Sequence, residues 1–237
     1  MTKSHEQSLA DRFNKFMSGQ GSKLRRNFEA FSLDGDDRDT GGDYVMTDTD
    51  RFVIVEFKYV EAGILAEGVK ERRLELCRKL AANADMARLH DCCHYVAWGE
   101  LPGRITKILT NVYRFEVCNS RVFGSACTWT TGQPPQRDSA GEFARKFFTQ
   151  TQSRSLSKDE FETYIGWVKT ETSGAEQAEI ELVASQDDGD ELYLLRFSSI
   201  QELYDWAQEA FPKSIPGDAD DGAGPSGGSS PSRPRMI

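Results

Sequence analysis

The chain has 237 residues, of which 38% are hydrophobic, and this is enough for one domain with a small appendage. Its formal net charge of −9 argues against a protein that binds nucleic acid by bulk electrostatics. No run of 18 apolar residues occurs and the first residues lack the apolar stretch of a signal peptide, so we expect a cytoplasmic protein without a membrane partner.

Charge and cysteine usage refine this expectation. From Glu171 onward the chain has 14 acidic and 4 basic residues, whereas the part before it has 24 acidic and 25 basic residues. The acidity therefore belongs to the C-terminal part. The five cysteines are an odd number without the spacing of a disulfide framework, and we predict that their thiols are reduced.

The first elements are predicted to be a helix and a strand. Residues 5–17 fit a helix, because their apolar residues follow helical spacing and Glu6 shares the same stripe. A strand is expected from about Asn27. The loop that follows, DGDDRDTGGD at 34–43, has the aspartates of a calcium loop but carries Asp39 where the turn glycine belongs, so we do not predict calcium binding there.

The next two segments, DYVMT and RFVIVEFKY, predict a β-hairpin around a short polar loop. A loop of two or of four residues gives the same register, which sets Asp43 opposite Glu56. Directly opposed side chains share a face of the sheet, with Cβ atoms about 4.5–5.5 Å apart. Two facing carboxylates repel each other, so they need a proton or a cation between them. A three-residue loop or a bulge would instead turn Asp43 to the other face.

Glu56 and Lys58 lie in the middle of a strand whose other residues are mostly apolar. Because side chains in a strand alternate between faces, both charges point to the face that also carries Phe52 and Ile54. Charges in a nearly dry place are costly unless they are paired or hold an ion, and such pairs often mark a functional site. The alternative is a plain salt bridge at the frayed end of an exposed strand.

Residues 61–89 are predicted to form one amphipathic helix, with one apolar stripe made of Leu65, Val69, Leu76, Leu80 and Ala87. Arg73 falls inside this stripe and Lys70 at its margin. The ordinary interpretation of Arg73 is a side chain that lies along the apolar surface with its head in water. HYVAW then fits a short buried strand, and the segment after it changes from helical spacing to strand alternation near Tyr113.

Turn-forming residues at 130–141, TTGQPPQRDSAG, suggest a boundary. Helices near 141–150 and 156–170, two strands, IELVAS and ELYLLRF, and a last helix with the capping box of Ser199 and Glu202 are expected beyond it.

The tail from Lys213 is rich in Gly, Pro and Ser, and we expect it to be disordered. The predicted organisation is a core at 1–130, a C-terminal α+β extension at 140–212 and a disordered tail at 213–237.

HDCCH at 90–94 offers four candidate zinc ligands, which are His90, Cys92, Cys93 and His94. Structural zinc sites usually pair ligands that are separated by two to four residues, and adjacent cysteines rarely both bind one ion. We therefore favour buried core thiols over a metal site in this segment.

The order of these elements resembles the PD-(D/E)XK nuclease superfamily, whose motif is an Asp followed by Glu-x-Lys on the next strand. Here the motif is carried by GGDYVMTDTDRFVIVEFKY, and the resemblance covers about residues 5–100. The family's proline before the Asp is replaced by Gly42. The resemblance implies an α/β fold with a restriction-endonuclease-like core, in which helices flank a mixed central sheet.

The resemblance also implies residue roles. Asp43 and Glu56 would be the metal ligands for Mg²⁺ or Mn²⁺, and Lys58 would orient the attacking water or stabilise developing negative charge. Glu6 would match the acidic residue that many members place on the first helix. Arg73, or as a weaker candidate Lys70, would contact a phosphate.

The function predicted from this resemblance is hydrolysis of DNA phosphodiester bonds by a magnesium-dependent endonuclease that acts in restriction, repair or antiviral defence. Because a net acidic nuclease binds DNA weakly alone, a protein partner or a homo-oligomer is expected as well. The alternative is a non-catalytic member of the superfamily that serves as a binding or assembly subunit.

Overall fold

The computed structural model describes residues 3–33, 40, 42–100, 106–129, 137–149, 154–173, 181–187 and 192–211. The predicted loop at 34–43, the predicted boundary at 130–141 and the predicted tail from Lys213 lie wholly or partly outside these residues. Within the described residues, no helix combines the length and the apolar character needed to cross a membrane.

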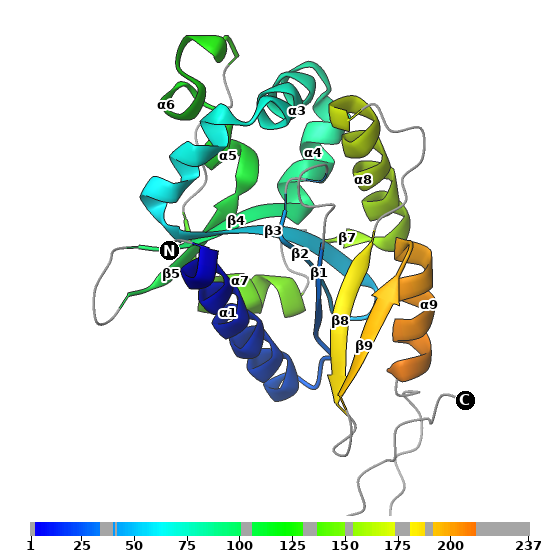
Figure 1. Ribbon diagram of the computed structural model, residues 1–237. Helices are drawn as coiled ribbons and strands as arrows, with labels where there is room; N and C mark the ends of the chain where they lie inside the picture. The colour runs from blue at the N-terminus through cyan, green and yellow to red at the C-terminus, as the bar shows by residue number, and fades with distance from the viewer. Residues whose placement is uncertain are drawn as a thin grey trace, which may run out of the picture.

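The protein is built on one mixed, mostly antiparallel sheet flanked by helices, which confirms the predicted α/β class with a mixed central sheet (Figure 1). Its strand order is β6-β5-β4-β3-β2-β1-β8-β9, and β7 pairs with β3 off this path. Among the described strands only β3 and β4 run parallel to each other. The strands are β1 (Glu29–Ser32), β2 (Tyr44–Thr47), β3 (Arg51–Val60), β4 (His94–Gly99), β5 (Ile108–Val112), β6 (Asp138–Ser139), β7 (Leu156–Ser157), β8 (Leu182–Asp187) and β9 (Leu192–Phe197).

Helices cover both faces of the sheet. In Figure 1, α1 and α7 lie on one side of the sheet, and α3, α4 and α8 lie on the other. The α-helices are α1 (Lys3–Lys23), α3 (Glu71–Ala82), α4 (Ala84–Cys93), α5 (Tyr113–Val117), α6 (Ser120–Phe123), α7 (Ala140–Thr149), α8 (Lys158–Ser173) and α9 (Ile200–Ala210), and the 3₁₀ helices are η1 (Glu61–Val69) and η2 (Gly124–Ala126). The first helix is thus longer at both ends than the predicted 5–17.

The alternation of β3 divides the core into two clusters. Phe52 and Ile54 belong to the cluster beneath α3, α4 and α8. Val53, Val55 and Phe57 belong to the cluster beneath α1 and α7. Glu56 and Lys58 share the parity of Phe52, so they point toward α3 and η1, as the sequence predicts.

The predicted hairpin register is confirmed. Tyr44 pairs with Val55 and Thr47 pairs with Phe52. The residue numbers of each pair add up to 99, which is the predicted register. The connection is the two-residue alternative, because the backbone N–H of Asp48 donates to the carbonyl of Arg51 at 3.3 Å. Extending this register by one position places Asp43 opposite Glu56.

The prediction of one helix at 61–89 is wrong. The chain forms η1, turns at Lys70, and then forms α3 and α4. Asn83 separates the two helices and is the N-cap of α4, where its side chain accepts a hydrogen bond from the Met86 N–H. A 3₁₀ helix repeats every three residues, so Ile64 and Glu67 are buried. The expected stripe residues Leu65 and Val69 are 47% and 87% exposed, whereas Leu76, Leu80 and Ala87 are buried as predicted.

The predicted order in the segment around Tyr113 is also wrong. The strand β5 comes first, paired antiparallel with β4, and the helix α5 follows it. The buried residues of α5, Tyr113, Glu116 and Val117, have helical spacing. The sequence analysis predicted helical spacing for the residues before Tyr113 instead.

Cys77 and Cys118 form a disulfide with Cα atoms 5.3 Å apart, which overturns the prediction that all thiols are reduced. It joins α3 to the residue after α5. Cys92, Cys93 and Cys127 are free. The two partners are separated by 41 residues, and only the fold brings them together.

The predicted C-terminal elements are confirmed at shifted bounds, as α7, α8, β8, β9 and α9. The Ser199 hydroxyl accepts from the Glu202 N–H at 3.1 Å, and the Glu202 carboxylate accepts from the Ser198 N–H at 2.8 Å. β8 pairs with β1, so these strands extend the same sheet.

Candidate functional site

The two charged residues of β3 lie side by side in the interior. Glu56 is 3% exposed and Lys58 is 7% exposed. The Lys58 ammonium is ion-paired with Glu56 and lies 2.9 Å from Glu67 Oε1. The salt bridge of the alternative interpretation therefore exists. The strand is not an exposed one, however, because β3 is central in the sheet and pairs with both β2 and β4.

Asp43 precedes β2 and turns its carboxylate toward β3. Its Oδ2 accepts a hydrogen bond from the Phe57 N–H at 2.6 Å. Burial, and then the negative charge of Glu56, raise the pKa of Asp43 to about 8, although the charge of Lys58 acts to lower it. The structure thus brings Asp43, Glu56 and Lys58 together, as the sequence predicts.

Gly42, which stands where the resembled family has proline, is closely packed. A Cβ atom at this position would lie 2.3 Å from Cγ1 of Ile54. Any larger residue would require a shift of Ile54 or of the backbone that carries Asp43. The glycine therefore fits the close approach of β2 to β3 beside Asp43.

Glu67 is a central residue that the sequence reading missed. It is fully buried on η1. Its Oε1 receives the ammonium groups of Lys58 at 2.9 Å and Lys70 at 2.7 Å, and its Oε2 accepts the Tyr113 hydroxyl at 2.8 Å. Glu67 follows the buried Ile64 by three residues, so the sequence would have predicted its burial only if a 3₁₀ helix had been expected here.

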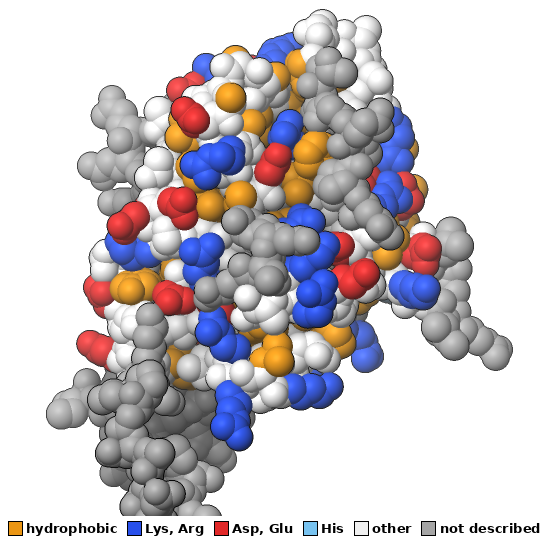
Figure 2. Space-filling model, turned by 180° about the vertical axis from the view of Figure 1, so that it is seen from behind, with side chains coloured by type: hydrophobic (Ala, Val, Ile, Leu, Met, Phe, Trp, Pro, Cys, Tyr) orange, Lys and Arg blue, Asp and Glu red, His pale blue; other side chains and the backbone are white. Residues whose placement is uncertain are grey.

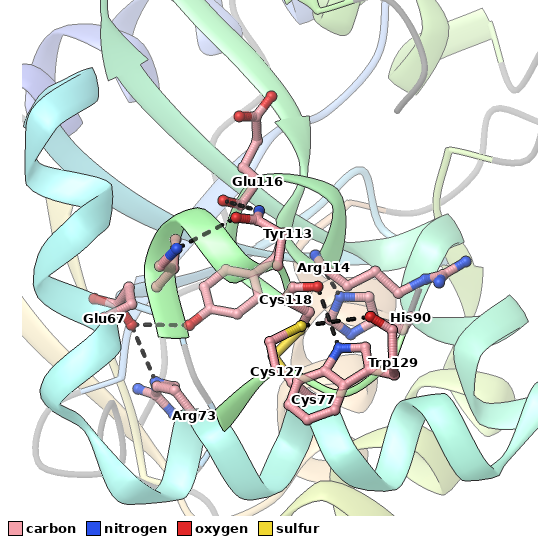
Figure 3. The surroundings of a disulfide bond; sticks show 12 residues. Glu67, Arg73, Cys77, His90, Tyr113, Arg114, Glu116, Cys118, Cys127 and Trp129 are labelled. Carbon is pink, nitrogen blue, oxygen red and sulfur yellow. Dashed lines mark hydrogen bonds and ion pairs between the residues drawn. A yellow bond between two sulfur atoms is a disulfide. The ribbon is translucent and has the colours of Figure 1, made fainter. Parts of the chain in front are cut away.

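Arg73 also lies beside Glu67 in the interior, as Figure 3 shows. It is 3% exposed, and its Nε is 3.4 Å from Glu67 Oε2. The interpretation of Arg73 as a side chain with its head in water is therefore wrong. The Lys70 side chain is 43% exposed and lies 3.7 Å from Glu56 Oε1, so it connects the buried charges with the surface.

These residues form what we call the β3 ionic cluster. Its members are Asp43, Glu56, Lys58, Glu67, Lys70, Arg73 and Tyr113. Burial acts to lower the pKa of Lys58, but the charges of Glu56 and Glu67 outweigh it and raise this pKa. Burial acts to raise the pKa of Glu67, but Lys58 and Lys70 outweigh it and lower this pKa to about 2. Lys58 and Glu67 are therefore both charged at neutral pH.

Glu6 lies on the other side of the sheet, on α1. Its neighbours contact the hairpin: the His5 ring packs at a tilt against Tyr59 with centroids 4.8 Å apart, and Gln7 donates to the Tyr44 hydroxyl at 2.7 Å. Glu6 is therefore close in sequence to residues that touch β2, which follows Asp43, and β3, which carries Lys58. Its role in the site stays a prediction.

The HDCCH segment forms a separate buried cluster. His90 and His94 both bond through Nδ1 to the Tyr164 hydroxyl, at 2.6 and 2.7 Å, and the Arg114 N–H donates to His90 Nε2. The proton of His90 is therefore on Nδ1, and Tyr164 donates to His94. Both ring nitrogens of His90 are thus engaged by protein groups.

Among the described residues, no set of three or more His, Cys, Asp and Glu side chains is arranged to hold a metal ion. Two neighbouring carboxyl groups, Asp43 and Glu56, do suit a hard divalent cation. Burial, and then the charge of Glu56, raise the pKa of Asp43, and a cation would relieve this repulsion.

Comparisons with protein-family models, with curated proteins and with solved structures gave no match for this chain. The fold and the β3 ionic cluster define an α/β protein with a buried, charged candidate site. A function can therefore be proposed only from the side chains themselves.

Proposed function

We propose that the protein is a metal-dependent nuclease that hydrolyses phosphodiester bonds of DNA. The observation that carries this proposal is the convergence of Asp43, Glu56 and Lys58 in one buried place. Asp43 and Glu56 are near enough for the charge of one to raise the pKa of the other, and Lys58 is ion-paired with Glu56. A buried carboxyl group whose pKa is raised by burial and by a charged neighbour is typical of catalytic sites.

The topology supports a restriction-endonuclease-like core. A helix, α1, is followed by the antiparallel strands β1, β2 and β3, then by α3 and α4, and then by β4 parallel to β3. This is the order that the resemblance to the PD-(D/E)XK superfamily implies. Asp43 directly precedes β2, and Glu56 and Lys58 lie on β3, which is the arrangement that this resemblance implies.

In this proposal Asp43 and Glu56 hold Mg²⁺ or Mn²⁺. The cation would offset charge on the phosphate and make a water molecule a better nucleophile. Lys58 stabilises negative charge that develops in the transition state. Lys70, which is 43% exposed, contacts a substrate phosphate more readily than the buried Arg73, whose charge balances Glu67.

Binding of DNA needs a local positive surface, because the whole chain has a net charge of −9. Figure 2 shows one face on which Lys and Arg side chains are numerous in the middle and lower part, with acidic side chains beside and between them. A partner subunit or a second copy would add to this surface. The proposed setting is restriction, repair or antiviral defence.

The test is cleavage of duplex DNA, single-stranded DNA and RNA by the purified chain with Mg²⁺, Mn²⁺, Ca²⁺ or EDTA. We expect Mg²⁺ or Mn²⁺ to support DNA cleavage and Ca²⁺ to bind without turnover. The matched control is Lys79→Ala, which removes an exposed lysine ion-paired with Glu171 at 2.6 Å. Cleavage that survives EDTA, or that Lys58→Ala leaves intact, would show that this mechanism is wrong.

A second candidate is a non-catalytic binding or assembly subunit with the same core. It is favoured by the ion pairs of Lys58, which bridge Glu56 and Glu67 and make a closed structural unit without any cation. This function predicts DNA or protein binding without cleavage under any metal. It also predicts that Lys58→Ala loses stability and binding together.

A further inference from the structure

We propose that Glu67 is a positioning residue that keeps Lys58 anchored when a divalent cation takes the Glu56 carboxylate. This inference rests on the proposed function, because it concerns the same site. It adds a residue outside the Asp and Glu-x-Lys motif. It also explains why a buried carboxylate lies on η1 at the back of that motif.

Lys58 is shared between two carboxylates. Its ammonium is paired with Glu56 and lies 2.9 Å from Glu67 Oε1. A cation that binds Glu56 competes for that carboxylate and leaves Lys58 with one partner fewer. Since an unpaired buried ammonium is costly, Lys58 would then turn away or lose its charge unless another carboxylate holds it. Glu67 is that carboxylate.

Both carboxylate oxygens of Glu67 have further partners. Oε1 also receives Lys70 at 2.7 Å, and Oε2 accepts from Tyr113 at 2.8 Å and lies 3.4 Å from Arg73 (Figure 3). Because both oxygens are engaged by cations or a hydroxyl, Glu67 could become a metal ligand only by breaking ion pairs. It is therefore placed to hold Lys58 rather than the cation.

The backbone of η1 is fixed beside Lys58. A Cβ atom on Gly63 would lie 3.4 Å from the Lys58 Cβ, so the 3₁₀ helix packs directly on the lysine stem. A Cβ atom on Gly68 would lie 2.2 Å from the Val122 carbonyl oxygen, so the residue after Glu67 is pressed against α6. Glu67 thus comes from an element separate from the hairpin that supplies Asp43 and Glu56.

The experiment compares wild type, Glu67→Gln and the control Glu75→Gln, a partly exposed glutamate on α3 that pairs with Arg78. Nitrogen-15 NMR of the lysine ammonium groups, with the Lys58 signal assigned by its loss in Lys58→Arg, is recorded with and without saturating Mg²⁺. A salt-bridged, buried ammonium gives a sharp signal, and a released one does not. Calorimetry measures the Mg²⁺ affinity of each protein.

We expect the Lys58 signal to persist in wild type and in Glu75→Gln with and without Mg²⁺. In Glu67→Gln it should persist without Mg²⁺, because Glu56 remains, and disappear when Mg²⁺ is added. The cleavage rate at saturating Mg²⁺ should fall by about 10- to 100-fold in Glu67→Gln, with little change in Mg²⁺ affinity. Glu67→Asp should restore part of the rate.

Persistence of the Lys58 signal in Glu67→Gln with Mg²⁺ would overturn the inference, as would its loss from wild type. A weaker Mg²⁺ affinity in Glu67→Gln would make Glu67 a ligand instead. Loss of the signal as expected, in a protein that cleaves no substrate, would uphold the anchoring and refute the nuclease function. Should Glu67→Gln fail to fold, Tyr113→Phe removes one hydrogen bond from Glu67 and should broaden the same signal with Mg²⁺.

Discussion

Two buried polar clusters lie on the same face of the sheet, and they differ in charge. The β3 ionic cluster joins three carboxylates to two lysines and an arginine, and it reaches the surface through Lys70. The second cluster, His90, His94 and Tyr164, is fully buried. We call it the histidine–tyrosine cluster.

The histidine–tyrosine cluster is satisfied by neutral hydrogen bonds. Burial, and then electrostatic interactions with His94 and Arg114, hold the pKa of His90 well below its ordinary value. A closed neutral network of this kind stabilises one packing arrangement and offers nothing to a ligand. In the β3 ionic cluster, by contrast, Asp43 is protonated beside Glu56 at neutral pH. A cation could take the place of that proton.

Tyr113 connects the two clusters. Its ring packs against His94 with centroids 4.6 Å apart, and its hydroxyl donates to Glu67. The Cys77–Cys118 disulfide lies next to it, because Cys77 follows Arg73 by one helical turn and Cys118 follows α5 (Figure 3). The neutral cluster and the disulfide therefore support the element that carries Tyr113 to the candidate site.

The largest expected effect is a loss of cleavage activity that occurs on substitution in the β3 ionic cluster and not in the histidine–tyrosine cluster. Lys58→Ala and Glu56→Gln should each reduce the rate of metal-dependent DNA cleavage by about 100-fold or more, because Lys58 stabilises the transition state and Glu56 holds the cation. Tyr164→Phe should reduce it only in proportion to the folded fraction. Cleavage rates are read beside thermal unfolding curves of the same samples.

A stability readout serves as the control for this prediction. Glu56→Gln relieves the repulsion with Asp43 and is expected to change the melting temperature less than Tyr164→Phe does. If Lys58→Ala and Glu56→Gln lose stability and activity in parallel, the β3 ionic cluster is structural like its neighbour.

Much of the site could be predicted because it depends on strand alternation and hairpin register. Glu56 and Lys58 share a face by parity, and the sum of 99 sets Asp43 opposite Glu56, so neither needs knowledge of tertiary contacts. Glu67 could not be predicted, because a helical period of 3.6 turns it away from the face that a 3₁₀ helix gives it.

The disulfide could not be predicted for a different reason. Cys77 and Cys118 are 41 residues apart, and they meet only after the chain has passed through α4, β4 and β5. The same limit applies to Tyr164, which reaches the HDCCH histidines from α8. Sequence spacing within one segment carries no information about such partners.

The second prediction concerns that disulfide. Replacing Cys77 and Cys118 with serine should lower the free energy of unfolding by about 2–4 kcal/mol, because the crosslink restricts the unfolded chain. Urea denaturation of both proteins measures this change. In wild type, only the three free cysteines should react with a thiol reagent after denaturation without reductant. Labelling of all five would restore the sequence prediction of reduced thiols.

The third prediction compares one hydroxyl from each cluster. Tyr164→Phe leaves two buried histidines without their shared partner and should cost about 1–3 kcal/mol of stability. Tyr113→Phe should cost about 1 kcal/mol, since Glu67 keeps its ion pairs with Lys58 and Lys70. Urea denaturation again provides the measurement, and a larger cost for Tyr113→Phe would mean that the charged cluster, not the neutral one, secures this side of the fold.

The smallest expected effect is a pH dependence that belongs to the histidine–tyrosine cluster alone. Because the folded chain excludes a proton from His90, the unfolded chain binds more protons once the pH falls below the ordinary histidine pKa of about 6.5. His90 therefore contributes stability above that pH and progressively less below it.

The raised pKa values of Asp43, about 8, and Asp48, about 6, act in the opposite direction, since these groups gain protons in the folded state first. The wild-type profile alone thus mixes the two signs, and the difference between wild type and His90→Gln isolates the histidine. This difference in unfolding free energy should shrink by about 1 kcal/mol between pH 7.5 and pH 5.5. A difference that is constant with pH would mean that His90 has the same pKa in the folded and the unfolded chain, and the contrast between a neutral and a charged cluster would then be lost.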